Sequence, residues 1–515
     1  MRTPYFLLTF VLFCIRRAST APARGHSEVE DLLTWGEQSG VQCNNLKYDR
    51  SREVPGLLAT SGILGNSVIV SLPRRLALSV SAGQPCPIPH LVPVQLWSST
   101  NKHLQLALLL LDEFKKGTAS KWHPYIAALP TSCDTLVHWS EEELEELQYS
   151  TTEHEQHFLQ KVKHQVDELQ DLYWRLQSSA LVTQHNTTYD ELVWASDIVR
   201  SRALAIASPG GWLSRNSITA AAFAGQVLLR LPFFGQFQLT PQISGMCRMV
   251  MFVCVGSVLA GANPQGSMDV ALLPIIDSIP YNSSSQGHLQ VSRFGGSVEA
   301  FLGPGGATAG EQVTAAFAPA RNEELLQHRG LVETDNIHDF YMANVLEFVK
   351  QTAVDQPNEE QLQEVDKRPA LLKALTEARL TGHGWQPATL QALRFLYASE
   401  EELQAANTVK PIRWMTQLVQ QGQLPTFGYY FAQPQSYHTE TRVDQVLFSL
   451  CREIAQSKPT SLSDDSAAFT KQQQLGSISC TARQKLALQF RQAYKGLLHR
   501  CMLQHDVGGT TAGLA

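Results

Sequence analysis

The spacing of the apolar residues changes near residue 345, and this change limits the folds that the chain can adopt. Between about 288 and 317 apolar and polar residues alternate and Gly-rich turns interrupt them, which predicts short strands joined by tight loops. After about 345 apolar residues recur every three or four positions, which predicts helices to the end of the chain. We therefore expect an α+β chain in which a β-rich part precedes an all-α domain at 346–515.

Individual elements are also predicted before residue 345. A β-branched run at 67–72 ends at a proline and predicts a strand, whereas 31–41, 102–114 and 153–178 show helical spacing. The helix at 153–178 carries three histidines, at positions 154, 157 and 164. They do not form a His-Glu-x-x-His pattern, so we interpret them as surface residues and predict no metal site.

The composition excludes several classes of protein. The 515 residues carry 41 Lys and Arg against 47 Asp and Glu, so the basic excess typical of nucleic-acid-binding modules is absent. Apolar residues make up 43% of the chain, which is too many for a disordered protein. None of the nine cysteines lies in a Cys-x-x-Cys pair, so no zinc or thioredoxin-type motif is present.

The first 25 residues are interpreted as a targeting segment. Arg2 precedes an apolar run of about eleven residues, which is shorter than the roughly 20 that a membrane-spanning helix needs. Every charge from Arg2 to Arg24 is positive. Two readings stay open, an ordinary signal peptide or anchor and a two-step address that ends in a plastid. Sequons at Asn186 and Asn282 do not decide between them, because a chain of this length carries a few by chance.

Several blocks in fixed order resemble SET-domain methyltransferases of the Rubisco large-subunit lysine methyltransferase type, a group that includes an actin-histidine methyltransferase. The resemblance covers roughly 30–500. The blocks are 53–59 (EVPGLLA), 70–74 (VSLPR), 107–114 (ALLLLDEF), 120–130 (SKWHPYIAALP), 138–144 (HWSEEEL), 194–195 (WA), 201–203 (SRA), 273–277 (LPIID), 309–313 (AGEQV), 321–326 (RNEELL), 459–462 (PTSL) and 482–488 (ARQKLAL).

This resemblance implies a β-rich SET domain at 30–345 with a helical insertion at about 101–240, followed by a helical substrate-binding domain at 346–515. It also implies S-adenosylmethionine (SAM) as cofactor and a protein substrate that docks on the helical domain. We expect no nucleic-acid partner, no transmembrane helix in the mature chain and a monomer.

The resemblance assigns roles to four residues of a cofactor pocket. Glu53 matches the family's acidic cofactor contact, and Gly56 matches a glycine that permits close backbone approach. Arg202 matches the arginine that meets the cofactor carboxylate, and Asp277 matches the aspartate that opens the knot-like segment. Each of the four also has a purely structural reading, such as an ion pair for Arg202 or a chain turn for Gly56.

The chain departs from the family pattern in the cofactor pocket. Val54 replaces a glycine, and Pro280-Tyr281 replaces the Asn-His pair that holds the adenine end. Proline has no amide proton to donate, and neither residue has an amide side chain. Asn282 and His288 follow, but they would need a shifted loop to reach back.

It also departs from the pattern in the methyl-transfer channel. Phe317 stands where the family has a tyrosine, so the channel wall is kept and the hydroxyl is lost. Arg329 stands where the family has the Tyr of a Tyr-Gly-Phe segment, and its fixed charge is a poor neighbour for a substrate amine or a sulfonium.

Two functional hypotheses follow. The first is a SAM-dependent protein N-methyltransferase, acting on lysine or on another nitrogen. The second is a catalytically impaired SET-fold protein that serves as a protein-binding module, because the departures cluster on one small site. A secreted hydrolase is a distant third, since no nucleophile motif supports it.

Overall fold

The computed structural model describes residues 27–49, 55–178, 187–208, 268–292, 296–352, 357–408, 430–475 and 481–506. The predicted targeting segment, Glu53, Val54 and Asn186 lie outside the described residues.

The described strands before residue 345 form three small antiparallel sheets, apart from one strand that belongs to the C-terminal region. The largest sheet has the order β1-β4-β9-β8, the second has the order β5-β7-β6, and β2 pairs with β3. The predicted strand at 67–72 is confirmed as β4. The strands are β1 (Gln42–Cys43), β2 (Leu46–Asp49), β3 (Gly56–Ala59), β4 (Val68–Pro73), β5 (Leu78–Val80), β6 (Leu204–Ala207), β7 (Met268–Leu272), β8 (His288–Val291) and β9 (Ser297–Phe301).

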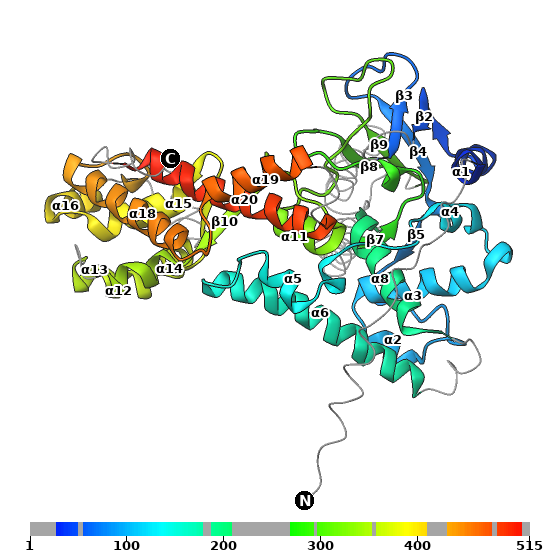
Figure 1. The fold of residues 1–515 in the computed structure, drawn as a ribbon, viewed down its shortest axis with the longest axis horizontal. Coiled ribbons are helices and arrows are strands. Elements are labelled where there is room, and N and C mark those ends of the chain that lie inside the picture. The colour runs from blue at the N-terminus through cyan, green and yellow to red at the C-terminus, as the bar shows by residue number, and fades with distance from the viewer. Residues whose placement is uncertain are drawn as a thin grey trace, which may run out of the picture.

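Helices lie against these sheets and extend away from them (Figure 1). The predicted helices at 102–114 and 153–178 are confirmed as α3 and α6. The helix predicted at 31–41 begins and ends earlier, as α1. The described helices of this part are α1 (Ser27–Gln38), α2 (Val94–Ser99), α3 (Lys102–Lys115), α4 (His123–Ala128), α5 (Glu141–Glu145), α6 (Glu153–Gln177), α8 (Tyr189–Arg202) and α11 (Asn322–Arg329).

The C-terminal part is helical, as expected, and it also contains a small sheet that the helical spacing did not indicate. The strands β10 (Phe340–Ala343), β11 (Ala378–Thr381) and β12 (Gly384–Trp385) pair in that order. The described helices are α12 (Val345–Gln351), α13 (Glu359–Asp366), α14 (Pro369–Thr376), α15 (Pro387–Tyr397), α16 (Glu400–Thr408), α18 (Tyr437–Gln456), α19 (Leu462–Leu475) and α20 (Ala482–Gln504).

The long helix α6 connects two hydrophobic cores. It starts at a capping box in which Thr152 and Glu155 bond each other's backbone N–H groups. Its first half contributes Phe158 and Val162 to the second core, which lies mainly among the C-terminal helices. Its second half contributes Leu169 and Leu172 to the first core, which surrounds the sheets. One helix therefore fixes the two cores relative to each other.

Polar contacts also tie the start of α6 to the C-terminal part, in a region that we call the junction (Glu155, Tyr341 and Lys458). The Lys458 ammonium lies 2.5 and 2.6 Å from the two carboxylate oxygens of Glu155, and both side chains are fully buried. The Tyr341 hydroxyl donates to the same carboxylate at 2.7 Å.

Among the described residues, no helix is long and apolar enough to cross a membrane.

Candidate functional site

A strained turn positions Asp277. The buried Ile275 has φ 71° and ψ −48°, a backbone conformation that is rare for a β-branched residue. A short 3-10 helix (Ile276–Ser278) follows, and the amide of Asp277 bonds the carbonyl of Leu273 at 3.0 Å. A strained backbone conformation persists only where the surrounding packing holds it. Such conformations occur most often at functional sites.

Asp277 is fully buried and only partly neutralised. The Tyr125 hydroxyl, on α4, donates to its Oδ2 atom. Arg202, the last residue of α8, bonds the Asp277 carbonyl oxygen at 3.1 Å, while its Nη1 atom lies 3.9 Å from Oδ1. That Oδ1 atom accepts no hydrogen bond from the described residues. Burial raises the pKa of Asp277 to about 6, although Arg202 and Tyr125 act in the opposite direction.

Pro280 fills the space beside Gly56. A Cβ atom at position 56 would lie 2.5 Å from Cγ and 2.6 Å from Cδ of Pro280, which is closer than side-chain atoms approach one another. Gly56 begins strand β3, and its backbone is buried. The Pro280 ring therefore occupies the space that a side chain at position 56 would need.

The Tyr281 hydroxyl is engaged by the backbone. It donates to the carbonyl of Ala320 at 3.3 Å and accepts from the amide of the same residue at 3.2 Å. A parallel bridge pairs Tyr281 with Ala315, and the Ser283 amide bonds the Glu333 carboxylate at 3.1 Å. Backbone contacts on two sides thus hold the segment that departs from the family pattern.

Among the described residues, neither Asn282 nor His288 forms a hydrogen bond that reaches back to Pro280–Tyr281, where the family has its Asn-His pair. The Asn282 carboxamide oxygen accepts from the Ser284 amide at 2.9 Å, which is a local turn. The His288 ring stacks on Phe301, with ring centroids 4.7 Å apart. Both side chains therefore contact other neighbours, Asn282 the Ser284 amide and His288 the Phe301 ring.

Phe317 and Arg329 complete the set of predicted residues. Phe317 is half-buried and packs against the first core, just after the bridge at Ala315. Arg329 ends helix α11, and its guanidinium carbon lies 5.1 Å from the centre of the Tyr281 ring. The next residue, Gly330, has φ 61°, and a Cβ there would lie 2.3 Å from the Asp134 carbonyl oxygen.

The structure therefore brings most of the predicted residues together. Gly56 contacts Pro280, Tyr281 follows Pro280 and contacts Arg329, and Arg202 contacts Asp277. These six residues, together with Phe317, are called the site. Burial lowers the pKa of the Arg329 guanidinium, and the nearby charge of Arg202 lowers it further.

Two residues of this arrangement were missed by the sequence analysis. Tyr125 lies within the quoted block at 120–130, and the need of a buried tyrosine hydroxyl for a partner is the signal that points to it. Ile275 carries no sequence signal, because nothing in its residue type indicates a positive φ.

His157 and His164 are exposed, as predicted, but the prediction is wrong for His154, whose side chain is only 13% exposed. His154 lies 2.8 Å from the buried carboxylate of Glu323. In the ranges that the structure covers, no group of three or more His, Cys, Asp or Glu side chains has the arrangement of a metal site.

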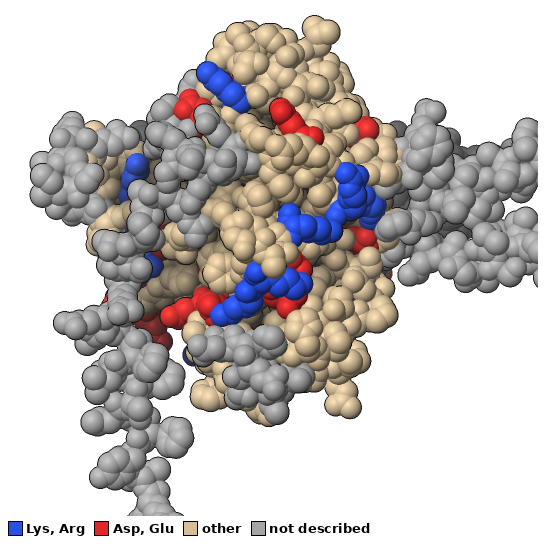
Figure 2. Space-filling model, turned by 90° about the vertical axis from the view of Figure 1, so that its right-hand side faces the viewer, with Lys and Arg blue, Asp and Glu red and all other residues tan. Residues whose placement is uncertain are grey.

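The face of the β-rich part carries both signs of charge. Figure 2 shows groups of Lys and Arg side chains there, with Asp or Glu side chains beside them. On this face the two signs of charge are therefore interspersed.

Comparison with known proteins identifies the fold. Solved structures of Rubisco LSMT, bound to AdoMet in one case and to lysine and AdoHcy in another, superpose with TM-scores of 0.53 and 0.54. Each superposition covers 94% of this chain and 92% of the solved chain, and the sequences are 17% identical. Residues 323–498 match the family model for Rubisco LSMT substrate-binding.

Curated relatives match over a shorter region. The chloroplastic Rubisco large subunit N-methyltransferase of Pisum sativum is 29% identical over 183 residues, which cover 34% of this chain and 35% of the relative. The Actin-histidine N-methyltransferase of Callithrix jacchus is 25% identical over 186 residues, which cover 35% and 31%. The chain thus spans about a third of the length of the curated relatives that it matches.

The class that these features define is a SET-fold protein whose C-terminal part is a helical domain. Within that class, the chain is similar in fold to Rubisco LSMT, and its residues 323–498 match the substrate-binding family model, as the sequence resemblance predicted.

Proposed function

We propose that this chain is a SAM-dependent protein N-methyltransferase that acts on lysine. The fold match along 94% of the chain to proteins solved with AdoMet and with lysine supports the proposal most directly. The names of the relatives, a Rubisco large subunit N-methyltransferase and an actin-histidine N-methyltransferase, support protein nitrogen as the acceptor class.

In this proposal the chain's own residues bind and orient two partners. SAM supplies a methyl group on a sulfonium, and transfer to an acceptor nitrogen requires nitrogen, carbon and sulfur in line. Arg202, Asp277 and the segment Pro280–Tyr281 surround the donor, and Phe317 forms an apolar wall for the acceptor. We include Gly56 among the donor contacts, although the Pro280 ring fills the space where its side chain would stand. Glu53 is also proposed as a donor contact.

A second candidate is a SET-fold module that binds a protein and transfers methyl groups poorly or not at all. The observation that favours it is the engagement of the tyrosine hydroxyls near the site. Phe317 has no hydroxyl, the Tyr281 hydroxyl is bonded by Ala320, and the Tyr125 hydroxyl donates to Asp277. Loss of one positioning group lowers a rate by about 100- to 1,000-fold.

Calorimetric titration of the full chain with SAM separates these candidates. Binding at micromolar SAM supports the transferase, whereas no heat at several hundred micromolar SAM overturns it and leaves the protein-binding module.

Phe317→Tyr tests the assignment of the acceptor wall. If Phe317 stands where a positioning hydroxyl is needed, the tyrosine should raise the rate of methyl transfer from labelled SAM to protein by about 10- to 100-fold. Phe317→Leu is the matched control, because it keeps an apolar wall and adds no hydroxyl. Robust transfer by the wild type, unchanged in Phe317→Tyr, would show that Phe317 lies away from the chemistry.

We further propose that the protein substrate docks on the C-terminal domain. A pocket of about 430 Å³ lies among the C-terminal end of α18, the start of α19 and the second half of α20. Apolar residues such as Leu462 and Met502 line it beside the exposed hydroxyls of Ser461 and Ser463.

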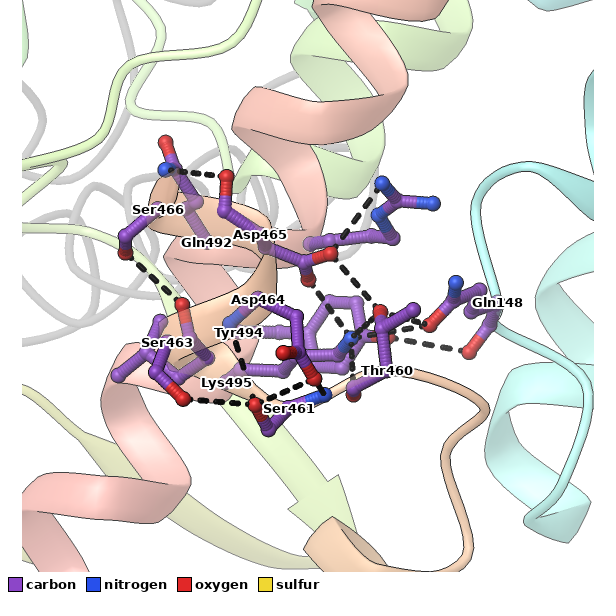
Figure 3. A network of polar contacts seen from close by, with 12 residues as sticks. Gln148, Thr460, Ser461, Ser463, Asp464, Asp465, Ser466, Gln492, Tyr494 and Lys495 are labelled. Carbon is purple, nitrogen blue, oxygen red and sulfur yellow. Dashed lines mark hydrogen bonds and ion pairs between the residues drawn. The ribbon is translucent and has the colours of Figure 1, made fainter. Parts of the chain in front are cut away.

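A rigid polar network holds this pocket (Figure 3). The Lys495 ammonium bonds Asp465 at 2.7 Å, the Thr460 carbonyl at 2.7 Å and Gln148, from the first half of the chain, at 2.9 Å. Hydrogen–deuterium exchange with a substrate protein present should protect the start of α19. Unchanged exchange there would rule out docking at this pocket.

The destination is a separate proposal. The chloroplastic relatives in Pisum sativum and Nicotiana tabacum favour a plastid over secretion. A fluorescent fusion of residues 1–60 tests it, and secretion of the fusion would contradict it.

A further inference from the structure

Arg329 is fixed in a half-buried position within the site. It ends helix α11, where Gly330 turns the chain in a left-handed conformation against the Asp134 carbonyl. Its guanidinium stacks on the Tyr281 ring, and that ring is itself held by two hydrogen bonds between its hydroxyl and the Ala320 backbone. Both stacked groups are therefore positioned before any ligand arrives.

The arginines near the site outnumber the carboxylates that pair with them. Arg200 pairs with Glu168 at 3.3 Å, and Arg202 has Asp277 at 3.9 Å. Among the described residues, no carboxylate lies within ion-pair distance of Arg329. Its neighbour His328 adds no second charge at neutral pH, because burial and the surrounding arginines lower the pKa of that imidazole to about 4.

Helix stability alone is a weak reason for this arrangement. A cation at a helix C-terminus gains about 0.3–1 kcal/mol from the helix dipole, and an exposed lysine would supply that gain. Arg329 instead gives up part of its hydration against an aromatic ring, and its planar fork of donors suits a bidentate oxyanion. A ligand anion would restore the missing half of the ion pair.

We propose that Arg329 recognises a carboxylate of the bound ligand and thereby sets the specificity of the site. This inference rests on the proposed function, because it names the chemistry of a group that enters the same site. Two ligands could present such a group, namely the amino-acid end of the donor and a carboxylate on the acceptor protein beside the nitrogen. Arg202 bonds the Asp277 carbonyl and Arg200 pairs with Glu168, whereas the described residues give the Arg329 guanidinium neither a hydrogen bond nor an ion pair.

Calorimetry with paired probes tests the inference and separates the two sources. The donor pair is S-adenosylhomocysteine and methylthioadenosine, which lacks the amino-acid carboxylate. The acceptor pair is N-acetylglutamate α-amide and N-acetylglutamine α-amide, which differ only in the side-chain carboxylate. Each probe is titrated into the full-length wild type, Arg329→Gln, Arg329→Lys and Arg379→Gln. The last variant is the matched control, because Arg379 is also half-buried and lies 4.7 Å from the centre of an aromatic ring, that of Phe340 in the C-terminal sheet.

If the carboxylate belongs to the donor, Arg329→Gln should weaken S-adenosylhomocysteine binding by about 10- to 100-fold and methylthioadenosine binding less than twofold. If it belongs to the acceptor, Arg329→Gln should abolish the preference for the glutamate probe and leave both nucleosides unchanged. Arg329→Lys should retain part of either preference, since it keeps the charge and loses the fork.

Carboxylate preferences that are equal in the wild type and Arg329→Gln would overturn the inference. Failure of the wild type to bind either nucleoside would instead overturn the proposed function, and the acceptor probes would still show whether Arg329 selects a carboxylate.

Discussion

The junction and the site both bury charged groups, but they satisfy them to different degrees. At the junction Lys458 contacts both oxygens of Glu155, and Tyr341 and two backbone amides bond the same carboxylate. At the site Asp277 keeps one oxygen without a hydrogen bond from the described residues, and Arg329 has no carboxylate partner among them. A fully hydrogen-bonded network stabilises one arrangement, whereas polar groups without partners can bind a ligand.

The largest effect is expected at the junction. Lys458→Met should lower the free energy of unfolding by about 3–5 kcal/mol, because it leaves the buried Glu155 carboxylate without its cation. Urea denaturation measures the change. Adding Glu155→Gln should recover part of it, while Lys373→Met, which breaks an exposed pair with Glu377, should change little. A loss below 1 kcal/mol in Lys458→Met would remove the contrast between the two regions.

A smaller, pH-dependent effect is expected at the site. Burial raises the pKa of Asp277 to about 6, so the folded state holds this proton more tightly than the unfolded state does. The contribution of Asp277 to stability is therefore present below about pH 4 and is lost as the pH rises to about 6. Two pKa units correspond to about 3 kcal/mol. Asp277→Asn should abolish this dependence in urea titrations between pH 4 and 7.5.

The control for that titration is Asp171→Asn, because Asp171 is exposed and pairs with Arg175 on the surface of α6. Stability curves of wild type and Asp277→Asn that run parallel over this pH range would show that Asp277 is already satisfied. The site would then resemble the junction.

The smallest effect concerns the close contact between Gly56 and Pro280. Gly56→Ala should lower the free energy of unfolding by about 1–3 kcal/mol, because the new Cβ would overlap the proline ring. Pro280→Ala in the same chain should restore part of the loss, whereas Gly62→Ala, which meets nothing within 4 Å, serves as the control. A neutral Gly56→Ala would mean that the 280 segment moves easily, as ligand entry requires.

Much of the architecture was predictable from the sequence, because apolar spacing reports local structure. The β-branched run predicted β4, the alternation from about 288 predicted the short strands β8 and β9, and the helical spacing predicted α3 and α6. The small sheet β10-β11-β12 was not predicted, since its strands are short and helices α12 to α14 separate β10 from the other two. Pairing between distant short strands leaves no local pattern to read.

The sequence by itself determined which residue types stand at the site. It showed that Phe317 lacks a hydroxyl and that Pro280 and Arg329 depart from the family pattern. Only the tertiary structure decided which groups are engaged: Tyr281 by Ala320, Gly56 by Pro280, and Asp277 by Tyr125, which lies 152 positions away in the chain. Burial and pairing depend on distances between remote segments, so they arise only when the chain has packed around them.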